Sequence, residues 1–462
     1  MSSKKLFILL PDGVGLRNFA FTSFVETGVK AGWETVFWNK TPFSLKELGY
    51  REISLEGKPR AFTDLLKRAK IISELNFFQK KFNDPVYGDY KFPAASKGLK
   101  NKLKNLVVDF LVLSHSGKKG LQRLRKRLIN SERKSNYYKA CKAVLEKEKP
   151  DFIFCTNQRA GHAIAPLTAA ADLNIPTATF IFSWDNLPKA TMVVETDYYF
   201  AWSDYMKKEL LKFYPYIKPE QIKITGTPQF EPHFDPLLRK TQETFFQENN
   251  LDPDKEYICF SGDDVTTSPN DPQYLKDIAE AVQNLNRSGR KLGIIFRRCP
   301  VDFSGRYEEV LHEYHDIITP VAPKWKKLGE RWNEILPTKE DLQLQMNTIL
   351  HTEAVVNVGS SMVFDYAVFD KPCLFLNYQA ENSQDKTWST DKIYNFVHFR
   401  SMPDKDAVFW LNTREEIEAK LVMALNENSH IISKAKKWFE IINYHPPQKA
   451  SERIWGEIET VI

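Results

Sequence analysis

The sequence predicts an α/β protein in which two doubly wound parallel sheets follow one another along the chain. The 462 residues exceed what one hydrophobic core usually holds, so at least two domains are expected. A strand–loop–helix–strand series begins at residue 5, and a second series in the same order begins near residue 257. Between them the chain is crowded with prolines, at positions 228, 232 and 236. We therefore place the domain boundary at residue 228.

The first series is easy to follow. Residues 5–10 are predicted to form a buried strand, because 6–10 are a continuous apolar run. Residues 11–18 contain two glycines and are predicted to be a loop. A helix is expected over 19–31, closed by Gly32, and a second strand over 33–38. The sheet pattern resumes later with expected strands at 151–155, 176–182, 198–202 and 222–225.

Residues 45–145 interrupt this pattern because they are rich in lysine and have a helical periodicity. The second half then supplies expected strands at 257–260, 292–296, 354–358 and 372–376. We predict an N-terminal domain at 1–228 with a basic helical insertion at about 45–145. A C-terminal domain follows at 229–430, and helices at 431–462 cross back. Because parallel sheets bind ligands beyond the carboxyl ends of their strands, we expect the two domains to face each other across a cleft.

Composition narrows the class of protein. The apolar fraction of 42% and the charged fraction of 27% are ordinary for a globular protein, and no run of eighteen uncharged apolar residues predicts a membrane span. The apolar run at the N-terminus is too short for a signal peptide. The five cysteines are scattered without a C-x-x-C pair, which argues against a cysteine zinc site and for a reducing compartment. We expect a cytoplasmic protein.

The charge is unevenly distributed. Residues 97–142 carry fourteen Lys and Arg against two acids, although the whole chain has a net charge of only +6. Apolar and cationic faces together would suit a helix on the anionic inner face of the cytoplasmic membrane. The alternative is a solvated, salt-bridged helical insertion. The basic run has no interleaved aromatic residues, so nucleic acid is not an expected partner.

The candidate donor site lies in the second half. Gly359, Ser360 and Ser361 stand between a strand and a helix, where backbone N–H groups and hydroxyls can bind phosphate. The alternative is an ordinary serine helix cap. Asp365, one helical turn later, could accept the hydroxyls of a ribose or be a solvated acid. Further donor-side candidates at strand ends are Arg297, Arg298, Gly262 and Thr227; the two guanidinium groups have a fork geometry that suits a diphosphate.

The candidate acceptor side lies in the first half. Sugar transfer with inversion needs a general base near the acceptor hydroxyl, and a carboxylate or a histidine can supply it. The three candidates for this catalytic role are Asp12, His162 and Asp185. The alternatives are a structural histidine at a helix start and an Asx turn of Asp185 with its neighbour. Arg17, Asn18, Arg159, Trp184 and Asn186 are the expected acceptor-side residues, although a buried tryptophan is commonly structural.

No metal or other cofactor is predicted. Asp263 and Asp264 are adjacent, and adjacent side chains in an extended loop diverge; no D-x-D spacing accompanies them.

Several motifs resemble a known family. Residues 354–374, AVVNVGSSMVFDYAVFDKPCL, resemble the donor-site strand and helix of GT-B enzymes of bacterial surface-polysaccharide synthesis, the closest pattern being that of CDP-glycerol glycerophosphotransferases. Ser360, Ser361 and Asp365 match the positions that hold the nucleotide there. Shorter resemblances are the hinge ITGTP at 224–228, the KASER element at 449–453, the SWDNL stretch at 183–187 and RRCP at 297–300, where Cys299 replaces the family's histidine.

The resemblance implies a GT-B glycosyltransferase that moves a sugar from a nucleotide-sugar donor to a glycan or lipid-linked acceptor without a metal. Three alternatives are open. They are a CDP-polyol phosphotransferase, an isomerase like UDP-N-acetylglucosamine 2-epimerase, and a non-catalytic nucleotide-binding partner. The resemblance fades over residues 45–145, so it implies nothing about the basic insertion.

Overall fold

The computed structural model describes residues 3–91, 97–329, 334–381 and 388–462. The chain divides into two compact units, and this division is close to the predicted boundary. Unit 1 comprises residues 1–229 and 442–462, and unit 2 comprises residues 230–441. The return to unit 1 thus occurs at residue 442, whereas a separate C-terminal piece was expected from residue 431.

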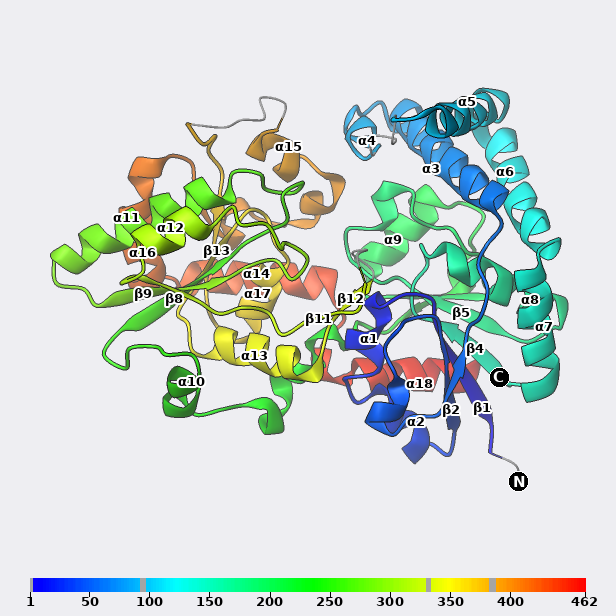
Figure 1. Ribbon diagram of the computed structural model, residues 1–462, viewed down its shortest axis with the longest axis horizontal. Helices are drawn as coiled ribbons and strands as arrows, with labels where there is room; N and C mark the ends of the chain where they lie inside the picture. Colours follow the sequence, from blue (N-terminus) through cyan, green and yellow to red (C-terminus); the bar gives the residue numbers. More distant parts are fainter. Residues whose placement is uncertain (1–2, 92–96, 330–333, 382–387) are drawn as a thin grey trace. The chain divides into compact units, whose positions relative to one another are not determined.

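Unit 1 is built on a seven-stranded parallel sheet with the order β3-β2-β1-β4-β5-β6-β7 (Figure 1). Its strands are β1 (Lys5–Leu10), β2 (Glu34–Asn39), β3 (Glu52–Ser54), β4 (Phe152–Cys155), β5 (Thr177–Phe180), β6 (Tyr198–Ala201) and β7 (Ile222–Ile224). Its helices are α1 (Val14–Phe19), α2 (Phe24–Lys30), α3 (Ala61–Phe82), α4 (Val86–Asp89), α5 (Leu99–Ser114), α6 (Gly117–Arg133), α7 (Asn136–Glu148), α8 (Ile164–Asp172), α9 (Asp204–Phe213) and α18 (Ala450–Thr460).

Unit 2 is built on a six-stranded parallel sheet with the order β10-β9-β8-β13-β14-β15. Its strands are β8 (Glu256–Ser261), β9 (Leu292–Arg297), β10 (Ile318–Pro320), β13 (Val355–Asn357), β14 (Cys373–Leu376) and β15 (Phe409–Leu411), and β11 (Lys326–Lys327) pairs separately with β12 (Ile335–Leu336). Its helices are α10 (Gln242–Glu248), α11 (Asp271–Arg287), α12 (Glu308–Glu313), α13 (Lys339–Leu350), α14 (Met362–Val368), α15 (Thr390–Tyr394), α16 (Ile417–Asn426) and α17 (Ser429–Ile442). The prediction of two α/β units with parallel sheets is confirmed.

Two predictions about unit 1 were wrong. The expected loop at 11–18 contains helix α1, because Leu16 and Phe19 are spaced to bury one helical face in the core. The insertion is not wholly helical, because its residues 52–54 form β3, which extends the sheet by pairing with β2. Three residues give too short a pattern to reveal a strand in the sequence.

The C-terminal helix α18 packs against α2 within unit 1. Trp455 is buried, stacks on Phe24 with ring centroids 5.2 Å apart, and donates its indole N–H to the Phe24 carbonyl at 2.7 Å. A Cβ on Gly28 would lie 2.0 Å from the Trp455 ring, so α2 needs a glycine where the tryptophan lies. This contact fixes the end of the chain to the sheet that its beginning forms.

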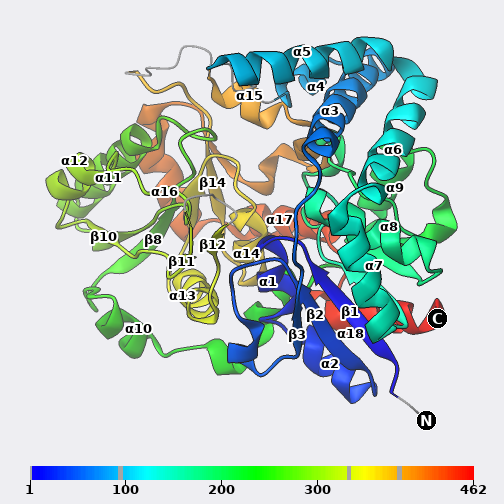
Figure 2. The same cartoon turned by 45° about the vertical axis from the view of Figure 1, so that its right-hand side comes forward.

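In unit 1, helices α3, α5 and α6 form a separate helical layer. Figures 1 and 2 both show α5 at the outer end of this layer, over α3 and away from strands β1 and β2. No helix in the described ranges combines the length and the apolar character needed to cross a membrane.

Candidate functional site

Each sheet has one place where the order of its strands reverses direction. In unit 1 this switch lies between β1 and β4, and in unit 2 it lies between β8 and β13. Ligands of doubly wound sheets bind outside the carboxyl ends of the strands at such a switch. The loops that follow these four strands are therefore the candidate sites, one in each unit.

The site in unit 1 is centred on Asp12, directly after β1. One carboxylate oxygen accepts a hydrogen bond from the backbone N–H of Val14 at 3.2 Å, and the other accepts one from the side-chain amide of Asn157 at 2.8 Å. A Cβ on Gly15 would lie 2.4 Å from the Thr156 hydroxyl, so only glycine lets α1 begin this close to the end of β4. The two switch-point loops are thereby held together.

Two cations lie beside Asp12. Burial raises the pKa of Asp12, and the neighbouring Arg159 and Lys67 act in the opposite direction. Burial likewise lowers the pKa of Lys67, whose ammonium lies next to the loop at Gly161. A carboxylate with a raised pKa is a stronger base, and the two cations favour its ionised form. Asp12 therefore has the properties of a general base.

Asn157 and Lys67 were not among the predicted site residues. Asn157 could have been found, because it lies two residues after a buried strand at the sheet's switch point. Lys67 gave no such signal. It lies in α3 of the inserted segment, and only the packing of that helix brings it to the loop.

Asp185, another of the predicted catalytic candidates, has side-chain partners on both carboxylate oxygens. One oxygen accepts from the Ser183 hydroxyl at 2.5 Å and from the Asn186 amide at 2.8 Å, and the other forms an ion pair with Lys189. These partners fix the loop after β5. These side-chain partners favour a structural role for Asp185, and its catalytic role stays a prediction.

The remaining acceptor-side predictions divide by burial. Trp184, Asn186 and Asn18 are 6%, 2% and 5% exposed, so they pack inside the unit and offer little surface to an acceptor. His162 lies before α8, where its backbone carbonyl accepts a hydrogen bond from Tyr137 at 2.8 Å. Arg17 and Arg159 are half-buried. Of these six residues, Arg159 is the one whose charge acts on the candidate base Asp12, where it lowers the pKa of that carboxyl group.

Glu209 in α9 is a buried acid that the sequence did not single out. It is 5% exposed, and its Oε2 has no hydrogen-bond partner among the described residues. Burial raises the pKa of Glu209 to about 8, and the nearby charge of Asp185 adds to this while Lys212 opposes it. The carboxyl group is therefore largely protonated at neutral pH.

We expect Glu209→Gln to remove a pH dependence of stability. The folded state holds this proton up to about pH 8, whereas an unfolded glutamate loses it near its ordinary value of 4.5. The free energy of unfolding therefore falls as the pH rises between these values, by about 5 kcal/mol. Thermal unfolding from pH 5 to pH 9 should show the variant matching the parent at pH 5 and exceeding it at pH 9. Parallel curves would contradict the expectation.

In unit 2 the loop after β13 carries Gly359, Ser360 and Ser361. Gly359 has a φ of +68°, and a Cβ there would lie 2.8 Å from the Phe399 ring, so the turn needs a glycine. The backbone N–H of Ser360 donates to the side-chain oxygen of Asn357 at 2.7 Å. The backbone N–H of Ser360 is therefore already used within the protein. Helix α14 has only seven residues, so its N-terminus is not by itself evidence for an anion site. The two half-exposed hydroxyls are the groups left for a ligand.

Two of the predicted donor-side residues are buried and have internal partners. Asp365 is 2% exposed, and its carboxylate lies 2.8 Å from the ring of His233, which is itself buried. It therefore connects α14 to the segment Pro228–Phe234, and its role as a ribose partner stays a prediction. Arg297 is 6% exposed, and its Nη2 donates to both oxygens of Asp341 at 2.9 Å. It anchors α13 to the end of β9.

Arg298 is the more accessible of the two arginines. It is half-buried and lines a cavity of about 410 Å³, together with Cys299 and Trp325. Gly262 lies under Tyr307, whose hydroxyl would be 2.9 Å from a Cβ at that position. Thr227 is fully buried and belongs to unit 1, where its backbone N–H donates to Asn443 at 2.9 Å. It connects the end of the first segment of unit 1 to the returning chain, and its role in donor binding stays a prediction.

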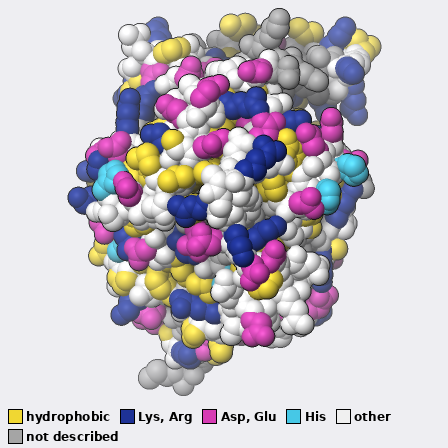
Figure 3. Space-filling view, turned by 90° about the vertical axis from the view of Figure 1, so that its left-hand side faces the viewer, with side chains coloured by type: hydrophobic (Ala, Val, Ile, Leu, Met, Phe, Trp, Pro, Cys, Tyr) yellow, Lys and Arg dark blue, Asp and Glu magenta, His cyan; other side chains and the backbone are white. Residues whose placement is uncertain are grey.

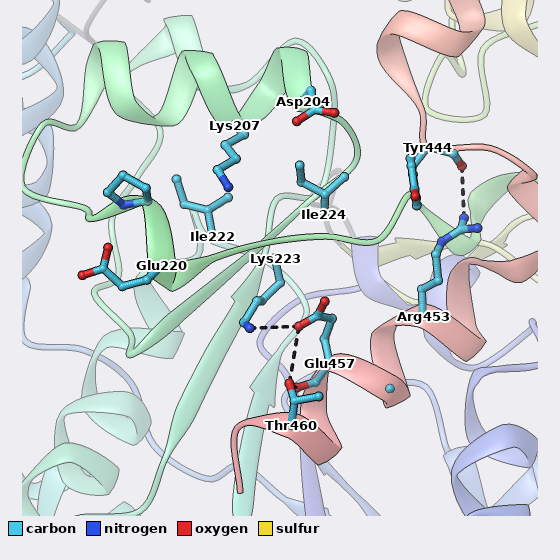
Figure 4. Close-up of a pocket in the computed structure, with 12 residues that line it drawn as sticks. Asp204, Lys207, Glu220, Ile222, Lys223, Ile224, Tyr444, Arg453, Glu457 and Thr460 are labelled. Atoms are coloured by element: carbon cyan, nitrogen blue, oxygen red, sulfur yellow. Dashed lines mark hydrogen bonds and ion pairs between the residues drawn. The ribbon is translucent and has the colours of Figure 1, made fainter.

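A larger hollow in unit 1 lies away from the switch point (Figure 4). It has a volume of about 790 Å³ and runs along the edge strand β7 between α9 and α18. Lys223 and Glu457 form an ion pair of 2.9 Å across it, and Arg453 donates to the Tyr444 carbonyl at 3.0 Å. Strands β5 and β6 separate this edge from β4 in the sheet, so the hollow is not part of the candidate site.

Within the described part of the chain, no three His, Cys, Asp or Glu side chains are grouped as metal ligands. Metal independence itself stays a prediction.

Comparison with solved structures identifies the architecture. A UDP-GlcNAc 2-epimerase from Methanocaldococcus jannaschii superposes with a TM-score of 0.51 at 16% identity, covering 99% of each chain. A glycosyltransferase from Rickettsia africae gives a TM-score of 0.52 at 10% identity, covering 99% of each chain. The chain has the GT-B fold. The S. aureus MnaA–UDP co-structure agrees, with a TM-score of 0.51 at 12% identity over 99% of this chain and 96% of that one.

Comparison by sequence is less informative than comparison by structure. No protein-family profile matches the chain. A processive diacylglycerol β-glucosyltransferase of Staphylococcus aureus is 32% identical over 118 residues. That match spans 26% of this chain and 28% of the relative, well under half of either. The comparisons therefore show the GT-B fold, with a partial sequence similarity to one glucosyltransferase, and do not indicate one reaction.

Proposed function

We propose that the protein is a glycosyltransferase that moves a sugar from a nucleotide-sugar donor to a glycan or lipid-linked acceptor in the cytoplasm. The observation that carries the proposal is the cluster of Asp12, Asn157, Arg159 and Lys67 at the switch point of unit 1. It supplies a base of raised pKa beside two cations. A partial similarity to a relative named as a diacylglycerol glucosyltransferase supports a lipid-linked acceptor.

In the proposed reaction Asp12 takes the proton of the acceptor hydroxyl. The hydroxyl oxygen then attacks the anomeric carbon, and the bond from that carbon to the nucleotide diphosphate breaks. Ser360, Ser361 and Arg298 of unit 2 are the proposed partners of the diphosphate, because donors placed at the developing charge stabilise the leaving group. No metal is assigned a part in this reaction.

A second reading is an isomerase that needs no acceptor. It is supported by the fold of the M. jannaschii UDP-GlcNAc 2-epimerase, which covers nearly the whole chain. Incubating the protein with a sugar nucleotide that it binds, without any acceptor, distinguishes an isomerase from a glycosyltransferase. An isomerase converts it to a second sugar in the absence of acceptor, whereas a transferase releases nucleotide only when acceptor is present. Transfer of a polyol phosphate from a CDP-alcohol is a third reading, and it would require CDP conjugates as donors.

The proposal is tested first by thermal stability against UDP, GDP, CDP, CMP and their sugar conjugates, with and without EDTA. A ligand present at a hundred times its Kd should stabilise the protein by about 2.7 kcal/mol. We expect one nucleoside diphosphate to raise the unfolding temperature equally in EDTA. Ser360→Ala and Ser361→Ala should each weaken its binding by about fivefold, since each removes one hydrogen bond.

Ser433→Ala is the matched control, because this exposed serine lies in α17 of the same unit. It should bind nucleotide as the parent protein does. A folded sample that no nucleotide stabilises would overturn the assignment of the donor site and favour a non-catalytic role.

A further inference from the structure

Helix α5 carries an apolar stripe that unit 1 does not cover. Its large side chains are exposed over most of the helix: Leu99 by 75%, Leu103 by 55%, Leu106 by 64%, Val107 by 39%, Phe110 by 69% and Leu113 by 79%. Their spacing of three, four and seven residues places them on one helical face. Val108 and Leu111, on the opposite face, are the buried ones. Helix α5 therefore has two apolar faces, one packed on unit 1 and one exposed to solvent.

The surroundings of the stripe are strongly basic. On α5 itself the exposed Lys100 and Lys102 flank it, and Asp109 is the only acid of that helix. The next helix, α6, adds exposed cations at Lys118, Lys119, Arg123, Lys126 and Arg127. By contrast, the face of unit 2 in Figure 3 intersperses Lys and Arg with Asp and Glu. Apolar and cationic side chains thus occur together on α5 and α6, and Figures 1 and 2 show α5 at the outer end of this helical layer.

The stripe is rigidly mounted. Arg68 of α3 donates to Asn105 of α5 at 2.9 Å, and α3 is the main packing partner of α5. At the corner between α5 and α6, Arg127 donates to Nε2 of His115, so His115 carries its proton on Nδ1 and donates to the Leu111 carbonyl. A Cβ on Gly120 would lie 2.2 Å from the backbone of His115, so the two helices meet as closely as a glycine permits.

We propose that α5 is a membrane-docking helix whose apolar face enters the interface of an anionic lipid bilayer. The sixteen-residue helix lies in the membrane plane, its leucines and Phe110 among the acyl chains and the surrounding cations against anionic head groups. Charge complementarity favours this occupant. An apolar protein partner would not need the seven exposed cations beside the stripe, whereas they suit an anionic surface. The inference is independent of the proposed reaction, since it concerns α5 and none of the site residues.

The test is sedimentation of the full chain with vesicles of phosphatidylcholine alone or with phosphatidylglycerol added. We expect binding to the anionic vesicles, with the double variant Leu106→Asp/Phe110→Asp reducing it by about tenfold or more. Lys118→Glu/Lys119→Glu should reduce it by a smaller factor and remove most of its sensitivity to salt. Leu237→Asp is the matched control, because this leucine is 86% exposed but lies outside the helical layer; it should bind vesicles as the parent protein does.

Circular dichroism of the α5 variant establishes that it is folded, and its nucleotide-induced thermal shift separates this proposal from the proposed function. Equal binding of parent and α5 variant, or no binding of the parent to anionic vesicles, would overturn the proposal. A parent protein that is a dimer in solution, with the α5 variant a monomer, would also overturn it and assign the stripe to a second copy of the chain.

Discussion

We expect Asp12→Asn to lower the turnover of sugar transfer by about a hundredfold to ten-thousandfold, the range over which a general base contributes. The amide keeps the size of the carboxylate and can still accept the hydrogen bond of Val14 or Asn157, but it cannot take a proton. Initial rates with the donor that the nucleotide panel identifies provide the measurement. Nucleotide-induced stabilisation should be unchanged, because the donor candidates lie in unit 2.

The pH profile gives the same prediction a second readout. Because burial raises the pKa of Asp12, the parent protein should lose activity as the pH falls through that raised value, above the ordinary range of an aspartate. The low residual activity of the variant should lack this acidic limb. Asp185→Asn provides the comparison in the neighbouring loop, and its loss should be much smaller because that carboxylate holds Ser183, Asn186 and Lys189. If Asp185→Asn lost more activity than Asp12→Asn, the base would have to be reassigned.

We expect Lys70→Met to destabilise unit 1 by about 3–5 kcal/mol. Lys70 is 1% exposed, and its ammonium contacts the Glu74 carboxylate at 2.8 Å and the Met192 carbonyl at 2.5 Å. Glu74 is 4% exposed, and burial raises its pKa while Lys70 opposes this effect. Removing the lysine leaves a buried carboxylate without its cation, and urea unfolding would measure the cost.

Two further variants test whether the loss of stability comes from the uncompensated Glu74 carboxylate or from a general disturbance of α3. Lys70→Met/Glu74→Leu should recover most of the lost stability, because no buried charge is left uncompensated. Lys30→Met breaks an ion pair of the same i,i+4 spacing, with Glu26, but both of its side chains are exposed, and little change is expected. A double variant as unstable as the single one would refute the explanation. Since Lys67 lies one turn before Lys70, the same buried pair helps to hold Lys67 beside Asp12.

The strand ends were the most predictable part of the site. The apolar run within 5–10 predicts a buried strand. In a parallel sheet, the loop that follows a strand lies at the edge where ligands bind. Asp12, Ser360 and Ser361 could therefore be proposed from position alone. Burial was not predictable in the same way. Asp365 and Arg297 were proposed on the same grounds. In the structure, Asp365 contacts the ring of His233 and Arg297 forms an ion pair with Asp341, and both partners are distant in sequence.

The sequence by itself determined the two parallel-sheet α/β units and the loops in which their sites lie. It could do so because these features follow from local periodicity and from the order of strands and helices along the chain. Only the tertiary structure decided which polar side chains in those loops bond to other residues of the protein, as Asp185 does with Lys189. Likewise, only the packing of α3 brings Lys67 to Asp12, and only the packing of α5 leaves one apolar face of that helix in solvent. Both depend on contacts between segments far apart in the chain, for which sequence spacing carries no signal.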